Sequence, residues 1–234
     1  MIKIRKMLFI VAIFSVAMGF LESSVVIYIR EIYYPEGFDF PLVSFDNLIL
    51  ITELLREAAT ILMLISIALL AAGNFNQQFA IFLYSFGIWD ITYYIFLKLL
   101  IDWPASIFTW DILFLIPVPW IGPVIAPCLL SLTMITLALI IIYLQEQKYQ
   151  VKLLWKDWLL LIIGSLVVIG SFTVDYFSII CNNTSTGEIG TMIDHLQQFV
   201  PDKFNWYLFF IGWIFIVADI YYIYHRSKKC VPEI

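Results

Sequence analysis

The sequence predicts an all-α, polytopic integral membrane protein with six transmembrane helices and one short re-entrant or interfacial helix near residues 104–116. Hydrophobic residues make up 62% of the 234 residues and charged residues only 13%, about half the charged fraction of an average soluble domain. No soluble core of this size hides so much apolar surface, so we expect lipid to surround the bundle. Aromatic residues, 18% of the chain, gather near the ends of the apolar runs, as is typical of a membrane interface.

Apolar runs of the length that a bilayer requires, about 20 residues, recur six times along the chain. The first three runs are 7–29, 47–71 and 79–101, and the last three are 122–144, 157–177 and 204–224. The run 7–29 is too long for the apolar part of a cleaved signal peptide, so we expect it to remain as the first span. No long linker or low-complexity tract separates the runs, which favours a single transmembrane domain over residues 1–234.

The segment between the third and fourth spans predicts the short additional helix. Asp102-Trp103-Pro104 is typical of a helix start, with Asp102 as the N-cap and Pro104 in the first turn. About a dozen mostly apolar residues follow, too few to cross the bilayer, and four prolines then occur between residues 117 and 127. The sequence leaves open whether this helix re-enters the membrane or lies flat at the headgroups.

Basic residues lie mostly on one side of the predicted spans. Nine of the 13 lysine and arginine residues fall before the first span, between the fourth and fifth, or after the sixth: Lys3, Arg5, Lys6, Lys148, Lys152, Lys156, Arg226, Lys228 and Lys229. With six spans, these three segments share one face of the membrane. Because cytoplasmic segments are enriched in lysine and arginine, this bias predicts that the N and C termini are both cytoplasmic.

Ionisable residues also occur inside the predicted spans, where each costs roughly 2.5 to 3.5 kcal/mol by insertion scales and usually has a function. By the predicted topology, most of them fall in the outer half of the bilayer. Glu57 lies four residues after Glu53 and can share its helix face, and Arg56 lies three residues after Glu53 and can pair with it. Gly19, one turn before Glu22, allows a neighbouring helix to approach closely. We predict an intramembrane cluster that binds a ligand or an ion, with six candidate residues: Glu22, Glu53, Arg56, Glu57, Asp90 and Asp111.

Three chemical uses fit such a cluster. Carboxylates can bind a cation in place of its water ligands, or they can carry protons through the membrane. Arg56 can instead hold an anionic headgroup or substrate carboxylate while a neighbouring carboxyl acts as an acid or base. A structural role is the alternative, because Arg56 with Glu53, and Asp90 with Lys98, can neutralise each other and hold the helices together.

The sequence contains no motif for a haem, zinc or iron–sulfur cofactor. The two histidines, His195 and His225, are predicted on opposite faces of the membrane, which excludes a bis-histidine haem within the bundle. The three cysteines, Cys128, Cys181 and Cys230, are predicted in a helix, an outer loop and the cytoplasmic tail, which supports neither a disulfide framework nor a thiolate metal site. With a net charge of −5, the chain is not expected to bind nucleic acid.

These observations favour a transporter or channel-like protein for a cation or a proton-coupled small solute. An intramembrane enzyme acting on a lipid or isoprenoid substrate, and an accessory or scaffold subunit of a membrane complex, remain open as alternatives. A lipid-length cleft with the carboxylates at its mouth would indicate the enzyme, whereas internally paired charges without a cavity would indicate the scaffold. Six helices are few for enclosing a pore, which favours a homo-oligomer or a place in a larger membrane complex.

Overall fold

The computed structural model of the chain describes residues 2–43, 46–185 and 200–229. Six helices account for most of the described residues: α1 (Ile2–Tyr33), α2 (Asn47–Ala71), α3 (Phe75–Ile101), α4 (Ile125–Glu146), α5 (Trp155–Ser185) and α7 (Trp206–Lys229). All six are long and apolar enough to cross a membrane, which confirms the six predicted spans. The largest difference is in α5, which continues to Ser185 instead of ending near residue 177, so Cys181 lies in a helix and not in a loop.

The short helix predicted near residues 104–116 is not formed. Strands β1 (Trp110–Phe114) and β2 (Trp120–Pro123) pair in an antiparallel hairpin, in which Asp111 faces Gly122. Asp102 does not cap a new helix but ends α3, in a left-handed backbone conformation with φ 52°. The apolar run was compatible with either structure, because a short apolar segment fits a buried strand as well as a helix. Pairing between β1 and β2 satisfies the backbone groups that a helix would have satisfied internally.

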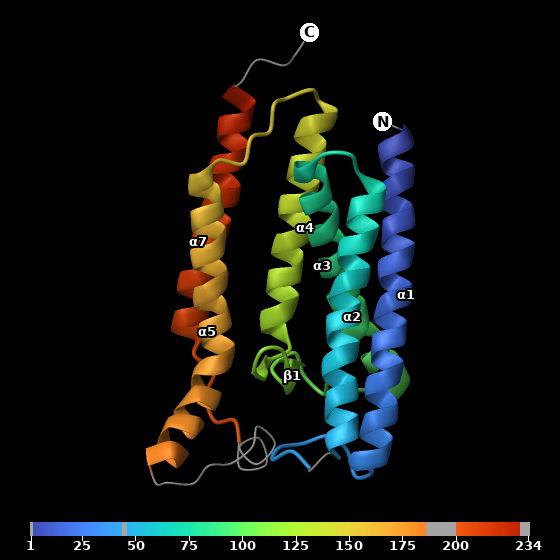
Figure 1. The fold of residues 1–234 in the computed structure, drawn as a ribbon, viewed down its shortest axis with the longest axis vertical. Helices are drawn as coiled ribbons and strands as arrows, with labels where there is room; N and C mark the ends of the chain where they lie inside the picture. The colour runs from blue at the N-terminus through green and yellow to red at the C-terminus, as the bar shows by residue number, and fades with distance from the viewer. Residues whose placement is uncertain (1, 44–45, 186–199, 230–234) are drawn as a thin grey trace.

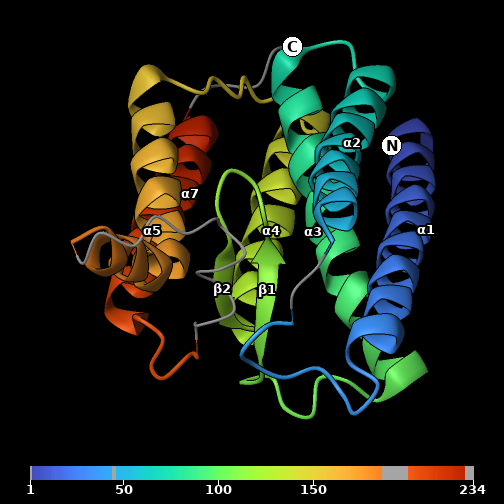
Figure 2. The same cartoon turned by 60° about the horizontal axis from the view of Figure 1, so that its bottom comes forward.

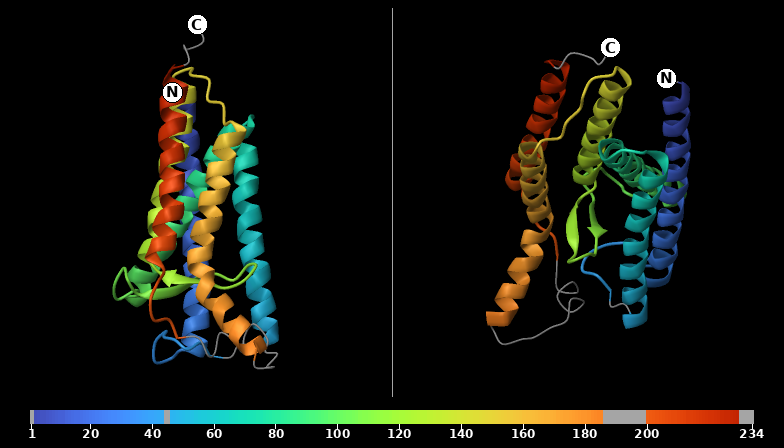
Figure 3. Two further views of the ribbon diagram at one scale, coloured as in Figure 1. Left: turned by 90° about the vertical axis from the view of Figure 1, so that its left-hand side faces the viewer. Right: turned by 45° about the horizontal axis from the view of Figure 1, so that its top comes forward.

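The helices form two groups (Figure 1). In the first group α3 packs against α1, α2 and α4, and in the second α5 packs against α7. Contacts of α4 with α7 and of β2 with α5 join the two groups. The hairpin lies between the groups, toward one end of the bundle, which we call the hairpin end (Figure 2). The start of α1, the α4–α5 connection and the end of α7 all lie at the opposite end (Figure 3).

Basic residues gather at that opposite end. Those with described side chains are Arg5, Lys6, Lys148, Lys152, Lys156, Arg226, Lys228 and Lys229. Among them, Arg226 donates two hydrogen bonds to the Asp157 carboxylate, at 2.8 and 2.6 Å, and so joins the end of α7 to the start of α5. Asp219, which is fully buried on α7, also lies close enough to Asp157 to interact with it. Three segments distant in sequence thus bring most of the basic residues to one face.

The contact between α1 and α3 depends on Gly19. A Cβ atom at this position would collide with the Thr92 side chain and would lie 3.0 Å from the Trp89 carbonyl oxygen. The close approach expected at Gly19 is therefore confirmed, and α3 is the neighbouring helix. Small residues at such crossings let two backbones pack directly against each other within a membrane.

Replacement of Gly19 by valine is expected to push α1 away from α3 and to destabilise the fold by about 1–3 kcal/mol, because the added methyl groups overpack the contact. Thermal unfolding of the purified protein in detergent measures this loss. Gly73→Val is the matched control, since no atom lies within 4 Å of a Cβ built at Gly73. Equal unfolding midpoints for the two variants would contradict the close α1–α3 contact.

Candidate functional site

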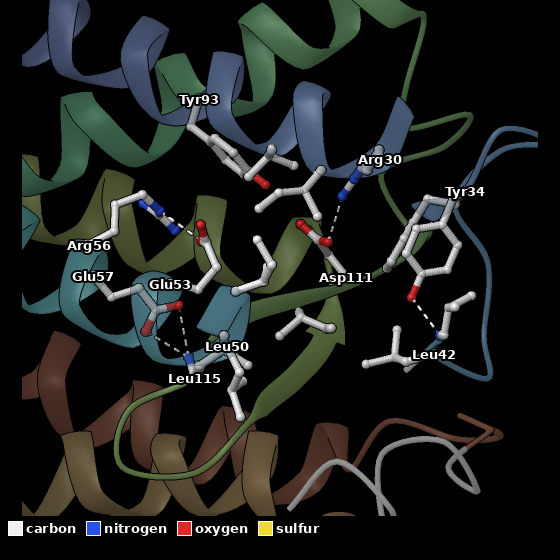
Figure 4. Close-up of a pocket in the computed structure, with 16 residues that line it drawn as sticks. Arg30, Tyr34, Leu42, Leu50, Glu53, Arg56, Glu57, Tyr93, Asp111 and Leu115 are labelled. Atoms are coloured by element: carbon white, nitrogen blue, oxygen red, sulfur yellow. Dashed lines mark hydrogen bonds and ion pairs between the residues drawn. The ribbon is translucent and has the colours of Figure 1, made fainter. Parts of the chain in front are cut away.

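Five of the six predicted site residues lie near the hairpin end, on α1, α2 and β1. Figure 4 shows four of them, Glu53, Arg56, Glu57 and Asp111. Together with Arg30 they form a group that we call the charged cluster: Glu22 and Arg30 on α1, Glu53, Arg56 and Glu57 on α2, and Asp111 on β1. The cluster holds four carboxyl groups and two guanidinium groups. If every group is ionised, two negative charges have no counter-charge within the cluster.

Arg56 lies between two carboxylates and connects α1 to α2. Its Nε donates a hydrogen bond to Glu53 at 2.8 Å, and its Nη1 donates to Glu22. The predicted pairing of Arg56 with Glu53 is therefore confirmed. Thr60, one turn further along α2, places its hydroxyl 3.5 Å from the second oxygen of Glu22. The three charged side chains are only 14–21% exposed, so a single cation balances two largely buried anions.

Glu57 faces the hairpin. Both of its carboxylate oxygens accept the backbone N–H of Leu115, at 3.1 and 2.9 Å, in the loop between β1 and β2. The residue is 6% exposed. Within the described ranges Glu57 forms no ion pair, and its hydrogen-bond partner there is a backbone N–H; the charge of Arg56 acts on it only from a greater distance. The hairpin loop is thus held to α2 through this carboxyl group.

Arg30 and Asp111 form the third part of the cluster. Arg30 Nη2 donates to Asp111 Oδ1 at 3.0 Å, and both residues are buried. The guanidinium lies against the rings of Phe38 and Trp103, with its Cζ 4.3 and 3.7 Å from the two ring centroids. Such cation–π contacts stabilise a charge that is largely shielded from water. In the described part of the chain, Arg30 Nη1 and Asp111 Oδ2 have no hydrogen-bond partner.

Burial raises the pKa of the Asp111 carboxyl from 3.8 to about 6, although the charge of Arg30 opposes this shift. The folded protein therefore holds the Asp111 proton more tightly than the unfolded chain does. As the pH rises from about 4 to about 6, the contribution of this carboxyl to stability should fall, by up to about 3 kcal/mol. The Asp111→Asn variant serves as the reference, because it has no titratable group at position 111 and keeps all the other carboxyl groups of the chain.

We therefore expect the stability of the wild type, relative to Asp111→Asn, to decrease across this pH window. Unfolding in detergent at several pH values between 4 and 8 measures both proteins under identical conditions. A difference that stays constant across the window, or that grows with pH, would contradict the shift.

A cavity of about 120 Å³ lies beside the cluster, between α1, α2 and β1 (Figure 4). Its polar lining comes from Arg30, Glu53, Arg56, Glu57 and Asp111, and from Tyr34 and Tyr93. The rest of the lining is apolar and comes from α1, α2, β1 and the α1–α2 connection. A volume of this size exceeds several-fold the roughly 10–15 Å³ that one water molecule needs by the same measure. Water or a small solute can therefore reach the charged side chains.

Asp90, the sixth predicted residue, lies outside the charged cluster. It accepts a hydrogen bond from the Ser131 hydroxyl at 2.7 Å, across the α3–α4 contact, and lines a different cavity. The proposed pairing of Asp90 with Lys98 is not formed. Lys98 pairs instead with Asp102 at 2.6 Å, on the surface near the end of α3. Asp90 and the charged cluster therefore belong to separate polar regions.

Several residues of the site were not predictable from the sequence. Arg30 was assigned to a position just beyond the first span, whereas α1 continues to Tyr33 and holds Arg30 at the cavity. The Leu115 N–H was not expected to bind Glu57, because Leu115 was predicted to lie in a helix. In a helix its N–H would be hydrogen-bonded to the helix backbone and not available to a side chain. Tyr34 and Tyr93 carried no signal that distinguishes them from the many other tyrosines of the chain.

Two residues considered for cofactor binding, His195 and Cys230, lie outside the described residues. Cys128 lies in α4 and His225 in α7, far apart in sequence and on different helices. Among the residues that the structure describes, no three histidine, cysteine, aspartate or glutamate side chains are grouped so that they could hold a metal ion. The chemistry of the described site is therefore that of carboxyl, guanidinium and phenol groups.

Comparison with known proteins identifies no relative. The chain matches no family model, no curated protein and no solved structure.

Proposed function

We propose that the charged cluster binds one positive charge, either a proton or a small cation, and couples it to the transport of a small solute across the membrane. In this proposal the basic end of the bundle faces the cytoplasm, following the enrichment of lysine and arginine in cytoplasmic segments. The charged cluster then lies in the outer half of the bilayer. The solute occupies the cavity beside Glu57.

The burial of Glu57 and its lack of an ion-pair partner are the main support for this proposal. A buried carboxylate without a counter-charge costs several kcal/mol, so a protein neutralises it with a proton or a bound cation. Glu57 is buried, lines the cavity, and in the described part of the chain has a backbone N–H as its hydrogen-bond donor instead of a cation. A proton or cation arriving through the cavity can reach it directly.

The hairpin supplies the element that such binding can move. An ionised carboxylate accepts a charge-assisted hydrogen bond from an N–H, and this bond is about twice as strong as a neutral one. Neutralisation of Glu57 therefore weakens its contact with the hairpin loop at Leu115. Binding of a proton or cation at Glu57 is thereby linked to the position of the hairpin, which lies between the two helix groups (Figure 2).

The cavity also offers groups that fit a solute. Arg30 Nη1 and Asp111 Oδ2 are buried and have no partner among the described residues, and both residues line the cavity. Neither atom is itself exposed to the cavity, so a solute there contacts the two residues through their other atoms.

The geometry favours transport over the two alternatives. A scaffold in which every charge is paired internally requires no cavity, whereas the cluster adjoins one. A lipid-modifying enzyme requires Arg56 and a carboxyl group together at the mouth of a long apolar cleft, whereas Asp90, the carboxyl group that lines the apolar cavity between α3, α4 and α5, does not share that cavity with Arg56.

Ion flux in reconstituted vesicles tests the proposal. Protein-containing liposomes with a pH-sensitive dye inside would be given an inside-negative potential and then pools of small solutes, in the presence or absence of Na⁺ and K⁺. We expect at least one pool to evoke proton or cation entry that empty vesicles do not show. The proposal fails if no pool evokes entry of any of these ions.

A further inference from the structure

The size of the cavity beside the charged cluster limits the solute that it can hold. Its volume is about 120 Å³. One water-sized group needs roughly 10–15 Å³ by the same measure, so the cavity has room for a molecule of roughly 8 to 12 non-hydrogen atoms. A bare metal ion would leave most of this space unfilled, and a whole phospholipid would exceed it. The size therefore indicates a small organic molecule.

Apolar side chains form most of the wall of this cavity. Nine of its sixteen lining residues are aliphatic residues or phenylalanine, among them Val26 on α1, Leu50 on α2 and Ile112 on β1. A sugar or another fully polar solute would gain little from contact with such a wall. A hydrocarbon group, in contrast, is stabilised there because it is removed from water. The solute that fits this wall has an apolar part.

The two excess negative charges of the ionised cluster lie in different places. One belongs to Glu57, which forms no ion pair in the described part of the chain and takes up the coupling ion in the proposed function. The other lies on Glu22 and Glu53, which share a single cation, Arg56. The remaining two groups of the cluster balance each other. A monocation beside Glu22 and Glu53 would remove their excess, whereas an anion would add to it.

Glu53 presents an acceptor for such a cation, because it lines the cavity and Glu22 does not (Figure 4). Glu53 Oε2 accepts the Arg56 Nε at 2.8 Å. The second oxygen, Oε1, accepts no hydrogen bond within the described ranges and is not fully buried. A protonated amine can donate to this oxygen, and a hydrogen bond between two charged groups is about twice as strong as a neutral one. An anionic solute would have to approach Arg56, whose charge the two carboxylates already outnumber.

We propose that the solute is a small apolar amine, bound in its protonated form with its ammonium group at Glu53 and its hydrocarbon part against the apolar wall of the cavity. This inference rests on the proposed transport function, to which it adds the chemical class of the solute. Glu57 stays available for the coupling ion, so the two cations together neutralise the two excess charges of the cluster. Because the two cations bind different residues, substitutions can separate binding of the amine from binding of the coupling ion.

The ligand used to test this site is 2-phenylethylamine, which has the required size and is protonated at neutral pH. Two molecules with the same ring carry a different headgroup: 2-phenylethanol is neutral, and phenylacetate is an anion. Calorimetric titration of the purified protein in detergent, corrected for titration into empty micelles, compares the three. We expect saturable binding of the amine at about one molecule per chain, at least tenfold tighter than binding of the alcohol, and no binding of phenylacetate.

Two substitutions locate the amine. Glu53→Gln removes the anion but keeps an acceptor for Arg56, and it should weaken amine binding about tenfold or more. Asp102→Asn is its control, because Asp102 is exposed outside the cavity. Val26→Phe narrows the cavity and should weaken binding by a similar factor. Val16→Phe is the matched control, since it adds the same ring at an exposed position of α1 outside the cavity.

Absence of saturable amine binding, or binding of the alcohol or of phenylacetate as tight as that of the amine, would overturn the assignment to an amine. Equal effects of Val26→Phe and Val16→Phe would overturn the location in the cavity. Glu57→Gln should lose flux but retain amine binding with at most a several-fold loss, and weakening equal to that of Glu53→Gln would overturn the placement of the ammonium group. Amine binding as expected, without ion flux from any pool of solutes, would support this site and contradict the proposed transport function.

Discussion

The Glu57→Gln variant is expected to lose ion-coupled flux completely in reconstituted vesicles while remaining folded. Glutamine has nearly the same size, and its amide oxygen can still accept the Leu115 N–H, so the hairpin keeps its anchor on α2. What the variant cannot do is take up and release a positive charge. If Glu57 is the coupling site, the Glu57→Gln variant cannot bind the coupling ion, and transport driven by that ion stops.

The control for Glu57→Gln is a carboxyl group outside the cavity that is replaced by its amide in the same way. Asp102→Asn is suitable, because the Asp102 side chain is 90% exposed at the end of α3, where it pairs with Lys98. We expect this variant to transport at the wild-type rate. Wild-type flux in Glu57→Gln would remove the central residue of the proposed function, whatever the behaviour of the control.

The Arg56→Met variant is expected to show the largest loss of stability. Arg56 is the only cation paired with Glu22 and Glu53 among the described residues, and the three side chains are at most 21% exposed. Removing one partner of a buried ion pair typically costs about 3–5 kcal/mol, because the remaining charge is left without compensation. Since this cluster keeps some solvent contact, we expect a loss near the lower limit, about 3 kcal/mol.

The origin of that loss is tested by removing the charges together. The triple variant Glu22→Gln, Glu53→Gln and Arg56→Met removes the two paired anions together with their cation, so neither of these carboxylates is left without its partner and most of the stability should return. Lys98→Met is the matched single control, because it breaks an exposed pair that contributes little. Thermal unfolding in one detergent compares all four proteins. If the triple variant is as unstable as Arg56→Met, packing of the Arg56 side chain, and not its charge, stabilises the bundle.

The six membrane-spanning helices could be predicted from the sequence because their signal is local. Each helix must present about 20 consecutive apolar residues to lipid, whatever its neighbours are. The predicted run 47–71 coincides with α2, and the other runs differ from their helices only at the ends. The i, i+3 pair of Glu53 and Arg56 was also predictable, because both residues lie on one helix whose geometry sets their separation.

The hairpin was not predictable in the same way. Residues 110–114 form an apolar segment that suits a strand or a short helix equally, and the choice depends on whether a second segment is available for pairing. Residues 120–123 provide that segment in the folded chain. Without the pairing, an N-cap and a proline in the first turn favoured a helix at residue 104, although the chain there leaves α3 in a left-handed turn.

The sequence by itself determined that this chain has six helices long and apolar enough to cross a membrane, that most basic residues lie at one end of them, and that carboxyl groups lie within them. These properties depend on residues close together along the chain. Only the tertiary structure decided which charges meet, since Arg30 pairs with Asp111 across 81 positions and Glu57 reaches Leu115 across 58. It likewise separated Asp90 from the charged cluster, because helix packing directs that side chain toward α4 and a different cavity.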